Sequence, residues 1–343
     1  MSESARQGDF GRDGGAAPET RGAGDVTPDT RGPESSPGAA FAGTAWARDR
    51  AGQVLLIAGH TWKEGLRRRM ILVGLLLTAA FVALYGVGVY YAFRDIAGMM
   101  GGPQSGATSL GAVTIDQNMI RDLAAYQTLS FGLFISSFLS AMLVIFLASG
   151  MISGEAENGT LQTIVTRPIA RVQIFLGRYL GYAGIYLAYL LLLVGGLLLL
   201  TRVFSGYAPP APVDAVVLLA LQGLIVLALV ALGSTVLSPI ATGILVLMAY
   251  GLAFIGGVVQ QIGIFLSNGT AEHIGGAVRY LLPSDAFFRM ALHGLAPVSS
   301  VLPFNIGPFG SPAPPTMGMV LYGVAYLVAC LAAGAYLFER RDI

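Results

Sequence analysis

The residues of this chain that could take part in chemistry gather in one polar stretch, residues 151–178 (MISGEAENGTLQTIVTRPIARVQIFLGR). Charged side chains make up only 11% of the sequence, yet this stretch carries five of them. They are Glu155, Glu157, Arg167, Arg171 and Arg178. Nucleophilic catalysis needs a base beside the nucleophile, and no such pairing stands out in the chain. The charges therefore suit the docking of a partner; the plain alternative is a solvated loop whose charges only set the topology.

The same stretch predicts a short surface helix. Glu155 and Glu157 precede residues 160–166, and carboxylates favour a helix N-terminus because of the helix dipole. Asn158 is a suitable N-cap, and Pro168 should end the helix at or just before its own position. We therefore expect a rod of about two turns that lies at the membrane surface between two apolar runs, where a soluble partner can reach it.

Other kinds of site find little support. A P-loop needs a glycine-rich loop followed by a lysine, and the only lysine, Lys63, follows no such loop, so this chain should not hydrolyse ATP. His60, His273 and His293 lack the spacing of metal ligands, and Cys330, the single cysteine, allows no disulfide within the chain. A net charge of +1 gives no basic stripe for nucleic acid. We expect no metal and no cofactor.

The elements that must position the polar stretch are apolar. Hydrophobic residues make up 55% of the chain, and a helix crosses a bilayer with about 20 consecutive apolar residues. The sequence therefore predicts an all-α integral membrane protein with six transmembrane helices, at residues 70–93, 127–152, 176–201, 213–236, 240–265 and 316–338. The interiors of these spans lack ionisable side chains, which ion-coupled carriers normally keep near the midplane. That pattern disfavours an ion-coupled carrier.

Residues 1–50 differ from the rest of the chain. They mix Gly, Pro, Ser, Asp and Arg with almost nothing to bury, so we expect a disordered cytoplasmic tail, followed by one six-span domain over residues 51–343. Arginines precede span one, separate spans two and three, and follow span six. By the positive-inside rule this side and both termini are cytoplasmic, in a multi-pass protein of the plasma (cytoplasmic) membrane.

Two longer segments are then external, residues 94–126 and 266–315. The second contains a helical pattern in SDAFFRMALHG, with Ser284 as a candidate N-cap and Gly294 as a candidate stop. Asp285 and Arg289 are four residues apart on this expected external helix, and we interpret them as a structural pair.

Residues 53–69 predict an amphipathic helix ahead of span one. Leu55, Ala58, Trp62 and Leu66 share one face, and basic residues follow the other. A helix of this kind lies in the membrane plane, with Trp at the interface and basic groups toward the lipid headgroups. The expected interface residues are Trp62, Lys63, Arg67, Arg68 and Arg69. The alternative is a cytoplasmic extension of span one.

Taken together, these motifs resemble those of type-2 ABC exporter permeases. The resemblance rests on a G-E-x-E-x-G-T-L, P-I-x-R and G-K pattern after the second span, with arginine here in place of the lysine. The matching residues are Gly154, Glu155, Glu157, Gly159, Thr160, Leu161, Pro168, Ile169, Arg171, Gly177 and Arg178. The stand-alone permeases that accompany nitrous-oxide-reductase maturation and gliding systems are similar in particular.

The resemblance implies a transmembrane permease subunit over residues 51–343. Residues 159–166 would be the coupling helix that docks on a separate ABC ATPase subunit, present in two copies, and residues 53–69 the elbow helix. The ATPase-coupling residues would be Glu155, Glu157, Gly159, Thr160, Leu161, Pro168, Arg171 and Arg178. The family exports its cargo and works as a pair of permease copies, here a homodimer or a heterodimer within the lipid bilayer. The alternative function is a non-transporting membrane scaffold or sensor that recruits a soluble partner.

Glycines offer candidates for close helix contact. They include Gly177-x-x-x-Gly181, Gly251 and the pair Gly256-Gly257. For Gly177 and Gly181, packing within the chain and packing between two copies are equally acceptable interpretations.

Overall fold

The computed structural model describes residues 38–67, 69–100, 108–110, 113–115, 117–153, 170–297 and 316–340. The chain divides into two compact units, residues 1–45 and 46–343. Within the described part, the first unit contributes only the N-terminal end of helix α1 (Gly38–Arg67).

Among the described residues, six helices are long and apolar enough to cross a membrane, as the sequence predicted. They are α2 (Arg69–Met100), α3 (Gln117–Ala148), α6 (Arg171–Ser205), α7 (Pro212–Val236), α8 (Pro239–Phe265) and α11 (Met317–Arg340). The all-α membrane fold is therefore confirmed. The main differences lie at helix ends: the second spanning helix runs over residues 117–148 instead of 127–152, and the third over 171–205 instead of 176–201.

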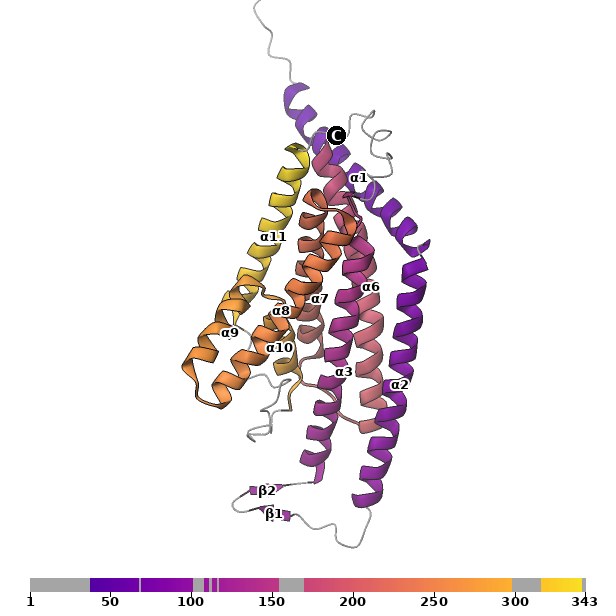
Figure 1. Cartoon of the computed structure of the whole chain (residues 1–343). Coiled ribbons are helices and arrows are strands. Elements are labelled where there is room, and N and C mark those ends of the chain that lie inside the picture. Colours follow the sequence, from indigo (N-terminus) through magenta and orange to yellow (C-terminus); the bar gives the residue numbers. More distant parts are fainter. Residues whose placement is uncertain are drawn as a thin grey trace, which may run out of the picture. The chain divides into compact units, whose positions relative to one another are not determined.

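The bundle has two ends that matter for function. At one end α3 finishes, α6 begins and α11 finishes; we call it the α3–α6 end (Figure 1). At the other end α2 finishes and a small antiparallel hairpin follows, formed by β1 (Thr108–Leu110) and β2 (Val113–Ile115). We call it the hairpin end. This hairpin is a small addition to the predicted all-α fold, in a segment expected to be an external connection.

Local sequence explains where several helices begin and end. Ser238 caps α8 by accepting a hydrogen bond from the Ala241 backbone N–H at 3.4 Å, and Pro239 follows at the first helical position. Gly206 ends α6 with a positive φ of 73°, which glycine adopts without strain. Asn268 caps the next helix, with its side-chain oxygen accepting from Thr270 N at 3.1 Å.

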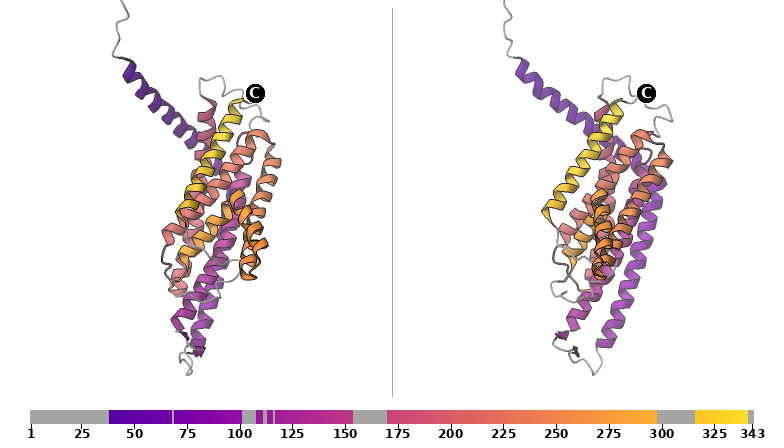
Figure 2. Two further views of the ribbon diagram at one scale, coloured as in Figure 1. Left: turned by 90° about the vertical axis from the view of Figure 1, so that its left-hand side faces the viewer. Right: turned by 60° about the vertical axis from the view of Figure 1, so that its left-hand side comes forward.

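The segment after α8 does not stay outside the bundle. Helix α9 (Gly269–Leu281) lies along α8, and helix α10 (Ser284–Leu295) packs mainly on α7 (Figures 1 and 2). Nine of the residues of α10 are buried. The expectation of an external helix at 284–294 was therefore wrong. Its apolar residues occupy all sides, which is the pattern of a buried helix.

The depth of α10 follows from its contacts. Near its C-terminal end, Gly294 O accepts from Ala211 N at 3.1 Å, just before α7 begins at the hairpin end. Asp285 lies nine residues earlier, about 14 Å along a helix axis, which is roughly half the thickness of a bilayer core. The pair α9–α10 thus re-enters the bundle, where protein buries its polar backbone ends.

Helix α1 extends further toward the N-terminus than predicted. It begins at Gly38, so residues 38–50, which we assigned to the disordered tail, are helical. The run GAAFAGTAWAR is rich in alanine, the residue with the highest helix propensity. Residues 1–37 lie outside the described part of the chain.

Candidate functional site

Most of the predicted coupling residues fall between residues 153 and 170. Glu155, Glu157, Gly159, Thr160, Leu161 and Pro168 lie outside the described residues, as does the expected helix at 159–166. Arg171 and Arg178 are described, on the first turns of α6. Together with the last described residues after α3, these two arginines define the frame from which the polar stretch emerges.

Arg178 joins the two sides of this frame. Its Nη1 donates to the backbone oxygen of Met151 at 2.6 Å, just beyond the end of α3. A cation near a helix C-terminus is favourable because the last carbonyls there lack partners within the helix. A hydrogen bond from a charged group contributes about 1.5–3 kcal/mol. Arg178 therefore fixes the start of α6 against the end of α3, although the polar stretch separates them in sequence.

Arg171 makes a weaker link to α11. Its Nη1 donates to the backbone oxygen of Glu339 at 3.4 Å on the exposed surface. Beneath it, the rings of Phe175 and Phe338 lie 6.5 Å apart, and both side chains are buried. Gly334 leaves room for Phe175 on α11. The beginning of α6 is thus held to the ends of two other spanning helices.

Helix α1 packs on α6 through glycines. A Cβ at Gly177 would lie 2.8 Å from Ile57 Cβ, and one at Gly181 would lie 2.6 Å from Thr61 Cβ and 2.9 Å from the Ala58 backbone oxygen. Gly177-x-x-x-Gly181 therefore serves packing within the chain, which settles the choice that the sequence left open. Small residues allow two helix backbones to approach closely in this way.

The four residues predicted to share the apolar face of α1 divide between two environments. Trp62 and Ala58 face α6, with Trp62 against Gly184, whereas Leu55 and Leu66 are 67% and 46% exposed. Lys63 is exposed. The side chains of Arg67, Arg68 and Arg69 lie outside the described part.

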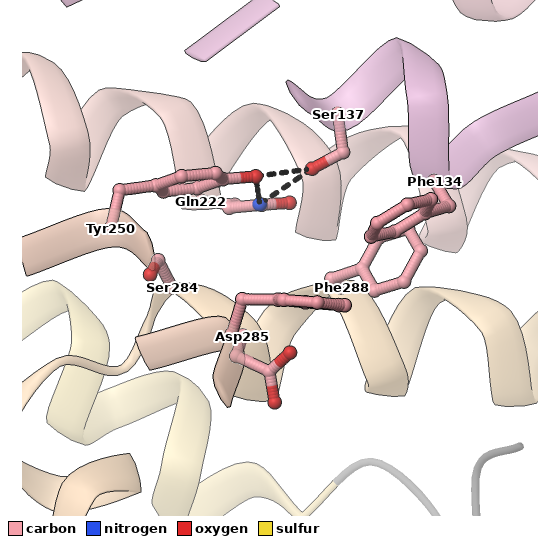
Figure 3. A pocket seen from close by; sticks show the side chains of 8 residues that line it. Phe134, Ser137, Gln222, Tyr250, Ser284, Asp285 and Phe288 are labelled. Atoms are coloured by element: carbon pink, nitrogen blue, oxygen red, sulfur yellow. Dashed lines mark hydrogen bonds between the residues drawn. The ribbon is translucent and has the colours of Figure 1, made fainter. Parts of the chain in front are cut away.

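A second group of polar side chains lies inside the bundle, near the middle of the spanning helices. Gln222 Nε2 donates to Ser137 Oγ at 2.7 Å and to the Tyr250 hydroxyl at 3.4 Å, and Ser137 and Tyr250 bond each other at 3.0 Å (Figure 3). These three residues belong to α3, α7 and α8. The pocket beside them has a volume of about 10 Å³, which is enough for a single water molecule.

Helix α10 brings a charged pair to the edge of this pocket. Arg289 Nε donates to Asp285 Oδ2 at 2.6 Å, and Arg289 Nη1 also donates to Gln261 Oε1 on α8. The side chains of Asp285 and Arg289 are only 7% and 12% exposed. Burial raises the pKa of Asp285, while the guanidinium of Arg289 lowers it. Gly257 faces the Asp285 carboxylate, so α8 and α10 can approach there only because this position has no side chain.

The sequence predicted the Asp285–Arg289 pair on an external helix. In the structure, the pair is buried inside the bundle. The missed signal is that apolar residues surround the pair on every side of its helix (Ala286, Phe287, Phe288, Met290, Ala291 and Leu292). The pocket residues Ser137 and Tyr250 gave no signal, because serine and tyrosine are common in spanning helices. Gly256 and Gly257 pack on α9 and α10, within the chain.

Comparison with known proteins identifies relatives. A model of the ABC-2 family of transporter proteins matches residues 55–343. The "Probable ABC transporter permease protein NosY" of Stutzerimonas stutzeri is 34% identical over 143 residues, or 42% of this chain and 42% of that protein. Its namesake from Pseudomonas aeruginosa is 32% identical over 135 residues, or 39% of this chain and 40% of the relative. The match thus spans less than half the length of these two relatives.

Proposed function

Because the chain belongs to the ABC-2 family of transporter proteins and is a transmembrane subunit of an ABC transporter, we propose that it takes its energy from a separate ATPase docked at the α3–α6 end. The observation that carries the proposal is the frame around residues 154–169. Arg178 joins α6 to Met151, after α3, and Arg171 joins α6 to α11. A force applied to residues 154–169 would therefore act on three spanning helices, α3, α6 and α11, at once.

The proposed mechanism is a change of bundle shape driven by nucleotide. Two ATPase copies, each a polypeptide of its own, close on ATP and move the stretch at 154–169, with Glu155, Glu157, Gly159, Thr160, Leu161 and Pro168 at the contact. ATP binds to the ATPases more tightly in one state of the complex than in the other, and it thereby favours the bundle shape of that state. A ligand shifts an equilibrium only through such a difference in affinity. Rigid-body motion of packed helices is the usual form of such a change.

We further propose that two copies of this chain form the translocation path, and that the direction is export. The described pocket inside one bundle, at about 10 Å³, is far below the 300–1,000 Å³ (roughly) of ligand sites. A path for cargo must therefore open between helices or between copies. In this arrangement the α3–α6 end and both termini face the cytoplasm, and the protein lies in the plasma (cytoplasmic) membrane, with α1 at its surface.

The test is ATPase capture and coupling. The chain is co-expressed with its candidate ATPase, purified in detergent and reconstituted, and ATP hydrolysis and partner retention are measured. A double variant, Glu157→Ala with Gly159→Pro, should lose the ATPase, whereas Glu339→Ala, at the same end but on α11, should retain it. Full retention by the double variant would contradict the docking site.

Two further measurements separate the alternatives. A membrane-impermeant label should reach a cysteine at Thr163 only from the cytoplasmic side; labelling from outside would reverse the orientation and remove the ATPase from reach. Spin labels across the α3–α6 end should change distance on ATP binding. Unchanged distances with retained partner would support the scaffold or sensor instead.

A further inference from the structure

The outer surface of the bundle carries an apolar groove between α2 and α6. Its volume is about 800 Å³, and it is lined by Ala83, Gly86 and Val87 on one side and by Leu200 and Phe204 on the other, among other residues. The lining from α2 includes small residues, Ala79, Ala83 and Gly86. Both helices are candidate membrane spans, so a ligand here would come from within the bilayer.

The two ends of the groove differ in polarity. At its inner end, Thr78 is the polar residue, and its hydroxyl is already bonded to Gly74 O at 2.8 Å and to the Tyr189 hydroxyl at 2.6 Å. This end can therefore accept only an apolar group. Toward the hairpin end, Tyr90 and Tyr91 line the groove, and the ring of Tyr90 packs edge-on against Phe204 with centroids 5.7 Å apart.

A positive charge stands at this second end. Arg94 follows Tyr90 by four residues on α2, so it shares the helix face of Val87 and Tyr90. Its side chain is exposed, and it is the last residue of the candidate span. Tyrosine and arginine at the end of a span occupy the headgroup region of a bilayer.

The length of the groove fits one lipid leaflet. Thr78 and Tyr91 are thirteen residues apart, about 20 Å along a helix, and one leaflet with its headgroup region is about 20–22 Å thick. The ligand that matches these features has a long apolar chain and an anionic head.

We propose that this groove binds one phospholipid of the surrounding bilayer, with an acyl chain along Ala83 and Val87 and the phosphate beside Arg94. The inference depends on the chain spanning a membrane but not on the ATPase. The two proposals can therefore fail separately.

The first experiment counts bound lipid. The full chain is purified in mild detergent with phosphatidylglycerol, and lipid per chain is measured by native mass spectrometry. Loss of one arginine–headgroup attraction, about 1 kcal/mol, should lower the affinity of Arg94→Gln about fivefold. Ala83→Phe should remove the lipid by filling the groove. Arg202→Gln, an exposed arginine near the same end of α6, is the matched control and should bind as the wild type does. Equal lipid in all four proteins, or none retained by the wild type, would overturn the proposal.

The second experiment needs no groove-filling variant. Vesicles that contain a phospholipid with a photoreactive acyl chain are used to label the wild type, and labelled residues are mapped. Val87 and Leu200 should be labelled well above Leu252 and Leu321, which are exposed on α8 and α11 outside the groove. Equal labelling would contradict a bound lipid. Disulfide formation between two Val87→Cys chains would show instead that a second copy occupies the groove.

Discussion

The buried pair Asp285–Arg289 offers the sharpest test of the re-entrant helix. Replacement of Asp285 by alanine leaves the guanidinium of Arg289 in a site where its side chain is only 12% exposed. Removal of one partner from a buried ion pair costs about 3–5 kcal/mol, because the remaining charge is left without compensation. Gln261 still accepts one hydrogen bond from Arg289, so we expect a loss toward the lower end of that range.

Replacement of both partners should be far less harmful. Leucine has nearly the shape of aspartate and would face Gly257 in the same way, and methionine can follow the path of the arginine side chain. Exchange of a buried ion pair for apolar residues of similar volume is often neutral or stabilising by about 1–4 kcal/mol. Here Gln261 loses the hydrogen bond from Arg289, which costs about 1–3 kcal/mol. The double variant should therefore be more stable than the single variant Asp285→Ala.

The assay is thermal unfolding of the purified chain in one detergent, for the wild type, Asp285→Ala, Asp285→Leu, Arg289→Met and the double variant Asp285→Leu with Arg289→Met. The cycle should give a coupling energy between the two sites of about 0.5–3 kcal/mol. Asp214→Ala, an exposed acidic residue in the first turn of α7, is the control and should change the melting temperature little. Additive effects in the cycle would mean that the two side chains do not meet, and the placement of α10 inside the bundle would then be wrong.

Substitutions at Gly181, Arg178 and Tyr250 test the frame and the pocket. Gly181→Leu should separate α1 from α6 and lower the melting temperature, because its Cβ would lie 2.9 Å from the Ala58 backbone oxygen. The control Gly195→Ala has open space around it, and its free energy of unfolding should rise by up to about 1 kcal/mol. Arg178→Met should lower the free energy of unfolding in detergent by about 1.5–3 kcal/mol. An equal decrease in Arg178→Lys would mean that the hydrogen bond to the Met151 carbonyl needs the guanidinium. Tyr250→Phe removes a hydroxyl shared by two partners and should cost about 0.5–1.5 kcal/mol in the same assay; no change would place the hydroxyl outside the network.

The spans could be predicted because each depends on local composition alone. A run of about 20 apolar residues has few alternatives to a membrane helix, and a serine followed by a proline, here Ser238 and Pro239, favours a turn such as the one between α7 and α8. The helix ends were harder to place. Helix α6 begins at Arg171, before the apolar run, where the arginine side chain contacts α11.

Contacts between distant segments could not be predicted in the same way. Gly177 and Gly181 contact α1 and not a second copy of the chain. This contact depends on how the chain folds back before span one. Asp285 lies at the same depth in the bundle as Tyr250. This position depends on the path of α9 along α8. In both cases one sequence pattern fits two environments, and only the neighbouring helix decides between them.

The position of Asp285 bears on the choice of energy source. The sequence argument against an ion-coupled carrier was that the spans lack ionisable groups at mid-depth, and α10 supplies such a group from outside the spans. Carboxylates that relay protons belong to an ion pathway through the bundle. Asp285 instead bonds an arginine that is itself held by Gln261, and its backbone packs on α7. The pair therefore links α8 and α10, and this arrangement supports our proposal that the energy comes from an ATPase at the α3–α6 end.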